Sequence, residues 1–139
     1  MSKGNTTEND YVKFVFNNVA MPSYGSNLYV ALHTADPGEA GDQTTNEIAY
    51  TGASGDYARQ AVSRDAGGWT VSNNQSSNAA LIQFPVSNTG PVTATHISIG
   101  TSVSGAGQIL ASGALNASLV INNLTQPQFA IGGILYEED

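Results

Sequence analysis

VTATHISIGTSVSGAGQILASGAL, residues 92–115, holds two segments with apolar residues on either side of a small, polar linker. In the first segment, 92–100, a single serine separates Ile97 from Ile99, so both side chains fall on one face of a strand. The second segment, 107–115, carries Ile109 and Leu115. Short apolar segments bounded by glycine and serine are typical of strands and turns, so we expect a strand in each segment.

The same pattern recurs along most of the chain. Further strands are expected at 28–33, 57–63, 67–72, 80–86, 117–124 and 127–138. About eight short strands at spacings of roughly 8–12 residues predict an antiparallel β-sandwich. Strands and helices do not alternate, which argues against a nucleotide-binding α/β sheet. The sequence therefore predicts an all-β fold with a single antiparallel β-sandwich, and the eight-strand jelly roll is the favoured form.

The N-terminus has a different character. Residues 1–10, MSKGNTTEND, are small and polar and predict a flexible arm without the apolar segment of a signal peptide. We therefore expect synthesis in the host cytoplasm without secretion-type processing, and one sandwich domain over 11–139. A short helix is expected after the arm, although β-branched and aromatic residues leave a strand as the alternative. Four apolar residues follow helical spacing there: Val12, Val15, Phe16 and Val19.

Composition excludes several classes of partner. The chain has 139 residues, four basic residues against eleven acidic ones, and a net charge of −7. A face that binds nucleic acid or an anionic membrane needs clustered cations, so neither partner is expected. Cysteine is absent, which excludes disulfides and thiolate metal sites. Charged residues make up only 11%, so the surface must be neutral and polar, as suits an exposed structural or binding protein.

An acidic loop over 35–56 is the first candidate for a metal site. Asp36, Glu39 and Asp42 supply carboxylates of the kind that calcium prefers. The EF-hand spacing of ligands is absent, and acidic loops on acidic proteins are usually solvated. We therefore expect no metal and no cofactor.

Two histidines and one tryptophan are the next candidates. His33 and His96, with an acid, have the chemistry of a zinc site or a general base. Hydrogen-bonded histidines on a half-exposed sheet face are the favoured interpretation, because no catalytic motif accompanies them. Trp69 has a ring that can stack on a sugar, yet a core position beside the Gly67–Gly68 turn is favoured. The sequence thus predicts a protein that is not an enzyme.

Two arginines are candidates for contact with a partner. Arg59 and Arg64 are half of the basic residues, and each is expected to offset a nearby acid such as Asp56 or Asp65. An ion pair between subunits is the alternative, because arginine is favoured at interfaces.

Two apolar residues of the loop are candidates as well. Ile48 and Tyr50 either dock on a partner or fold back on the sandwich of their own chain. A loop of ~20 residues is longer than compact domains usually carry without a function. The candidate partner-contact residues are therefore Ile48, Tyr50, Arg59 and Arg64.

The strand and loop around residues 28–62 resemble a known group of proteins. LYVALHTADPGEAG, NEIAYTG and YARQAV are similar to small virion proteins of tailed bacteriophages. The shared pattern falls at Leu32 to Pro37, at Glu47–Ile48 and at Tyr57 to Val62. The segments THISIGTSVSGAGQILASGAL and TQPQFAIGGILYEED also resemble that group, so that the likeness covers about residues 11–138. The segment ASGD before Tyr57 departs from the pattern and affects the expected shape of the loop.

The resemblance implies a structural role in the virion. The most concrete form is a cement or decoration protein that binds the major capsid protein on the capsid exterior as a dimer or trimer. The alternative is a tail-fibre or receptor-binding protein that recognises the host surface. A hydrolase that uses His33 or His96 is the remaining rival. The resemblance supplies no catalytic residues.

Overall fold

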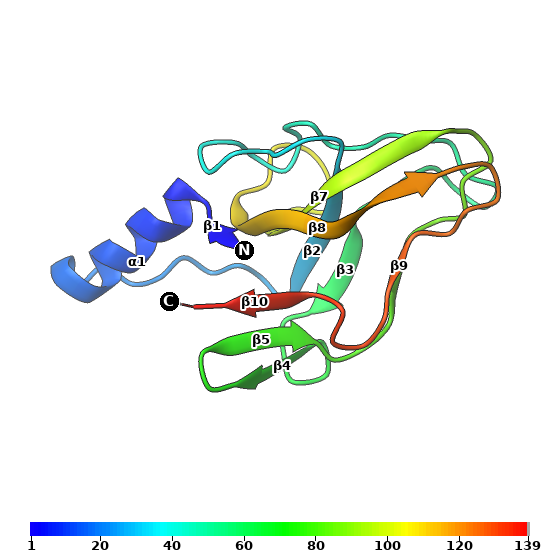
Figure 1. Ribbon diagram of the computed structural model, residues 1–139. Coiled ribbons are helices and arrows are strands. Elements are labelled where there is room, and N and C mark those ends of the chain that lie inside the picture. The colour runs from blue at the N-terminus through cyan, green and yellow to red at the C-terminus, as the bar shows by residue number, and fades with distance from the viewer. Residues whose placement is uncertain (139) are drawn as a thin grey trace.

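The computed structural model describes residues 1–138, in which one helix and ten strands form three antiparallel sheets (Figure 1). The elements are β1 (Ser2–Lys3), α1 (Asn5–Asn17), β2 (Asn27–His33), β3 (Gln60–Ser63), β4 (Trp69–Ser72), β5 (Gln75–Asn78), β6 (Ile82–Gln83), β7 (Val92–Gly100), β8 (Ile109–Ile121), β9 (Gln128–Phe129) and β10 (Leu135–Glu137). The predictions of an all-β, antiparallel, sandwich-like fold and of a short helix are confirmed.

The largest sheet has five strands in the order β1-β8-β7-β2-β3. The strand predicted over 92–100 has the bounds of β7. The strands predicted at 107–115 and 117–124 are instead one strand, β8, which pairs with β7 along both halves. The register of the β7–β8 pairing shifts between Ala94 and His96, which marks a β-bulge. Asn116 therefore lies inside β8 and does not form a turn between two strands.

Two smaller sheets face the large one. They have the orders β10-β5-β4 and β6-β9. The segment predicted as one strand at 127–138 is divided between them as β9 and β10. β5 was not predicted, because its sequence QSSN lacks the β-branched and aromatic residues that favour strands. It is held by its two neighbours, β4 and β10. The favoured jelly-roll form did not predict three separate sheets of five, three and two strands.

The apolar core lies between these sheets. Ile97 and Ile99 are both buried, as their spacing predicted, and they pack with Val30 and Leu32 of β2. Trp69, Ile82, Phe84 and Ile134 belong to the same core cluster and come from the smaller sheets and their connections. Trp69 is 8% exposed, which agrees with the core position favoured for it.

The central strand β2 is buried on both faces. Val30, Ala31, Leu32 and His33 each have 0% exposure, because the loop 35–56 covers the face that the core leaves free. Backbone hydrogen bonds fasten the loop to the edge of β2, from Ile48 N to Leu32 O (2.9 Å) and from Thr34 N to Asn46 O (2.8 Å), and the His33 side chain contacts Thr45 O of the loop. The prediction of a half-exposed His33 is therefore wrong.

The N-terminus is paired and helical. Ser2 and Lys3 pair with Ser112 and Ala111 of β8, and α1 begins at Asn5. The domain boundary predicted at residue 10 thus lies inside α1, whereas flexibility of residues 1–10 in the isolated protein stays a prediction. α1 has no buried residue and projects away from the sheets (Figure 1).

Candidate functional site

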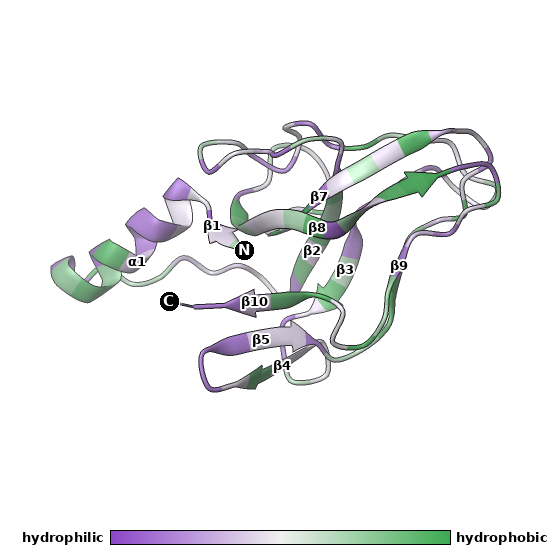
Figure 2. Cartoon of the chain, viewed as in Figure 1, coloured by the Kyte–Doolittle hydropathy of each residue, from purple (hydrophilic) through white to green (hydrophobic). Residues whose placement is uncertain are grey.

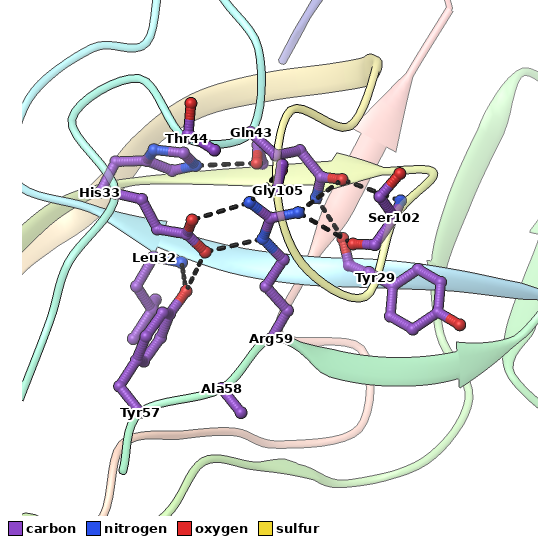
Figure 3. A network of polar contacts seen from close by, with 12 residues as sticks. Tyr29, Leu32, His33, Gln43, Thr44, Tyr57, Ala58, Arg59, Ser102 and Gly105 are labelled. Carbon is purple, nitrogen blue, oxygen red and sulfur yellow. Dashed lines mark hydrogen bonds and ion pairs between the residues drawn. The ribbon is translucent and has the colours of Figure 1, made fainter. Parts of the chain in front are cut away.

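A buried polar network surrounds Arg59, where the loop 35–56 meets the sheet (Figure 3). The Arg59 side chain is 2% exposed and forms a two-pronged ion pair with Glu47. Nε donates to Oε1 and Nη2 donates to Oε2, each at 2.7 Å. The predicted neighbour Asp56 does not form this pair within residues 1–138. Glu47 and Arg59 both lie in the segments that resemble phage proteins, and this was the only sequence signal that joined them.

The same arginine fastens a second loop. Its Nη1 donates to Ser102 O at 2.9 Å and its Nη2 donates to Gly105 O at 2.8 Å. Gln43, which has 0% exposure and was missed by the sequence analysis, donates to Tyr29 O and accepts from Ser102 N. The network therefore ties two long loops to β2 (Figure 3). The Arg59 donors are satisfied, and Arg59 and Gln43 are buried while Glu47 stays partly exposed, as suits a structural role.

Both ring nitrogens of His33 form hydrogen bonds within the chain. Its Nδ1 lies 2.9 Å from Thr45 O and its Nε2 lies 2.8 Å from Ser98 Oγ. The Thr45 carbonyl can only accept, so Nδ1 carries the proton and the Ser98 hydroxyl donates to Nε2. Burial lowers the pKa of His33, which favours this neutral form. A general base needs a free, accessible nitrogen, and His33 has none.

The other candidate ligands are not gathered into a metal site. His96 pairs in register with His33 across β2 and β7, and its Nδ1 contacts Thr95 Oγ1 at 2.9 Å. Asp36 accepts from Gly38 N, and Asp42 accepts from Thr44, whose hydroxyl and N–H lower the pKa of Asp42. Within residues 1–138 no three His, Cys, Asp or Glu side chains are grouped to hold a metal ion.

The four predicted partner-contact residues have different surroundings. Ile48 and Tyr50 are 2% and 7% exposed and belong to the core, and Tyr50 donates from its hydroxyl to Pro85 O at 2.7 Å. Their positions agree with the alternative in which they fold back on their own chain. Arg59 is covered by the network, whereas Arg64 is exposed, with its guanidinium over the ring of Tyr24. Contact with a partner stays a prediction for all four.

A wide apolar surface outside the core lies on α1 and the residues just after it. Figure 2 shows that the half of α1 farther from the sheets is hydrophobic. Seven apolar side chains are exposed in this segment: Tyr11 (52%), Val12 (50%), Phe14 (52%), Val15 (49%), Phe16 (78%), Val19 (49%) and Met21 (36%). The helical spacing was predicted, but its exposure was not. Monomers rarely leave so many neighbouring apolar groups in water, so this surface is a candidate interaction site.

An apolar groove opens beside the base of α1. It has a volume of about 590 Å³ and lies between the five-stranded and three-stranded sheets. Leu28 and Leu110 line one wall, Trp69 and Val71 line the other, and Arg64 stands among its lining residues. We call this the sheet groove. Sequence analysis missed it because its residues come from strands that are far apart in the chain.

Comparisons with known proteins point to the virion. A family model described as "Podophage GP4 fiber I protein gp80" matches residues 2–137. A comparison with curated proteins finds no match. Over residues 1–138 no helix is long and apolar enough to cross a membrane.

Proposed function

Because this chain belongs to the family of podophage GP4 fiber I proteins, we propose that it is a structural subunit of a podophage virion fibre. The family match covers nearly the whole chain and supports a virion structural protein. It favours the fibre alternative over the cement or decoration role on the capsid exterior. The major capsid protein is accordingly not the partner that we propose.

The exposed apolar surface of α1 is the observation that carries this proposal. Phe16 alone is 78% exposed, and no residue of the helix is buried. Such a surface has a role only when another chain covers it, which is what a subunit of a fibre requires. The function is therefore assembly, with no chemical step and no cofactor. The buried Arg59 network serves it by holding the long loops rigid on the sheet.

Localisation on the virion tests the proposal. An epitope tag at the C-terminus, introduced into the phage that encodes this chain, is labelled with gold-conjugated antibody and viewed by electron microscopy. We expect gold along fibres. Untagged virions control for non-specific labelling. Gold spread over the capsid faces would contradict the fibre role and support the cement role.

A further inference from the structure

We propose that α1 of one copy packs into the sheet groove of a second copy, so that the chain assembles head to tail. This inference rests on the proposed function, because it names the first partner of the fibre subunit. It assigns a role to two surfaces of the same molecule that are both apolar and both uncovered.

The helix has the surface of a buried element. At 100° per residue, the apolar side chains between positions 11 and 16 cover roughly half of the helix circumference. A helix that is apolar over so wide an arc is usually enclosed by other elements. With the exposed fractions given above, the six side chains other than Met21, which itself lines the sheet groove, present on the order of 500 Å², against the ~800 Å² that each partner buries in a standard interface.

The helix cannot fill the groove of its own chain. Its first turn is fixed by hydrogen bonds from Asn5 N to Glu39 O (2.8 Å) and from Thr7 Oγ1 to Ile109 O (2.9 Å). Gln108 Nε2 donates to Asp10 Oδ2 at 3.2 Å and holds the next turn. These contacts hold the N-terminal end of α1 at the sheets and leave its hydrophobic far end projecting away from them, as Figure 2 shows. A groove that needs a helix must therefore take it from another copy.

The groove complements the end of the helix in charge and hydrogen bonding. The last turn of α1 carries no basic residue, so the partial negative charge of the helix C-terminus is not offset within the turn. Arg64, Lys3 and Asp65 line the groove, and because Lys3 is already paired with Glu138, Arg64 is the cation that can face the helix end. The last carbonyls of α1 lack helical N–H partners and can accept hydrogen bonds from an exposed donor such as the Arg64 guanidinium.

The stoichiometry also favours a second copy. Each chain offers α1 to one neighbour and its sheet groove to another. Contact with two neighbours therefore covers both apolar surfaces of every copy. Such a contact is heterologous and produces either a closed ring or a filament. Anionic lipid and nucleic acid are poor occupants, because the chain has a net charge of −7.

Three single variants test the contact without removing core residues. Phe16→Asp places a charge on the helix, Val71→Asp places one in the groove, and Leu124→Asp is the control. The three native side chains are 78%, 73% and 75% exposed, so none of the variants removes a core contact. Thermal melting measured at low concentration, where each variant is a monomer, checks that they fold alike.

Sedimentation velocity over a range of concentrations measures assembly. We expect wild type and Leu124→Asp to form species heavier than the 14.4 kDa chain. Phe16→Asp and Val71→Asp should each raise the midpoint concentration of assembly about tenfold or more, because each places an unpaired charge at the centre of the contact. An equimolar mixture of these two should form heterodimers, since the helix of one and the groove of the other are intact.

Two results would overturn the inference. One is a wild-type chain that remains a monomer at every concentration. The other is a Val71→Asp variant that assembles like wild type while Phe16→Asp does not, which would indicate contact between helices alone. Gold labelling of virions is an independent measurement. If gold marks the fibres but the chain is a monomer in solution, only the inference is refuted. If gold marks the capsid, the proposed function is refuted.

Discussion

Arg59 and Glu47 are joined by two parallel hydrogen bonds of 2.7 Å, from Nε to Oε1 and from Nη2 to Oε2. The pair connects the residue directly before β3 with a loop residue that lies twelve positions earlier in the chain. Two-pronged arginine–carboxylate pairs are strong and directional. Because the arginine is buried, its charge depends on this partner and on the carbonyls of Ser102 and Gly105.

Loss of the guanidinium should therefore destabilise the fold. Arg59→Met leaves the Glu47 carboxylate without its counter-ion, and removal of one member of a buried ion pair costs about 3–5 kcal/mol. For a chain of this size we expect the melting temperature to fall by roughly 10 °C or more. Differential scanning calorimetry measures it.

The matched control is Arg64→Met, which removes the same group from an exposed site. Exposed substitutions of this kind change the free energy of unfolding by at most about 0.5 kcal/mol. Arg59→Lys keeps the charge but loses the two-pronged geometry, so its melting temperature should lie between the other two. Equal melting of Arg59→Met and Arg64→Met would show that the network does not stabilise the protein.

Stability should fall with acid because of His33. Burial lowers the pKa of the folded histidine below its ordinary 6.5, although the hydrogen bond to Thr45 O and the charge of Glu47 oppose the shift. The unfolded chain then binds more protons than the folded one below about pH 6.5, so the stabilising contribution is complete above that pH and is lost as the pH falls. The slope is at most about 1.4 kcal/mol per pH unit for one group.

Chemical denaturation between about pH 5 and pH 8 measures this slope. His33→Gln should reduce stability at every pH but flatten the dependence. The carboxyls whose pKa is lowered, Asp42, Asp65 and Glu138, lose their contribution only below about pH 4.5 and do not interfere. A slope that survives in His33→Gln would assign the titration to another group.

The loop residues Ile48 and Tyr50 should act through folding. Both are buried in the core cluster, so Ile48→Ser with Tyr50→Ser leaves cavities and unpaired groups. Each large-to-small change in a core costs about 2–5 kcal/mol, which should lower the melting temperature of the isolated protein sharply. Tyr50→Phe, which loses only the hydrogen bond to Pro85 O, should cost about 1 kcal/mol.

A different outcome would revive the docking role of this loop. If the double variant melts within a degree or two of wild type but fails to join virions, these side chains contact a partner after all. Leu124→Ser, at an exposed position, serves as the control for a serine substitution that touches no core.

Chelation should leave the protein unchanged. His33 is occupied by Thr45 and Ser98, and the loop acids accept hydrogen bonds from their own turns. We therefore expect equal melting temperatures with and without EDTA. A decrease of more than a few degrees on chelation, reversed by added calcium, would show that the acidic loop holds an ion.

The sequence by itself determined the fold class and the position of its main strands. The alternation of Ile97 and Ile99 with a small residue predicted the core face of β7, and a similar alternation predicted the strand β2. Side chains of a strand alternate between two faces with a period of two residues, so neighbouring positions suffice to detect it. The helical spacing that begins at Val12 likewise predicted α1. Such periodicity is a local property, so it does not depend on knowing the partner strand.

Only the tertiary structure decided which faces are covered. His33 and Gln43 are buried because the loop 35–56 folds over β2, and Glu47 meets Arg59 for the same reason. The apolar side chains of α1 remain in water because the first turn of the helix is bonded to residues near 39 and 109. Burial depends on contacts between segments distant in the chain, and the free energy of those contacts is not encoded in any single segment.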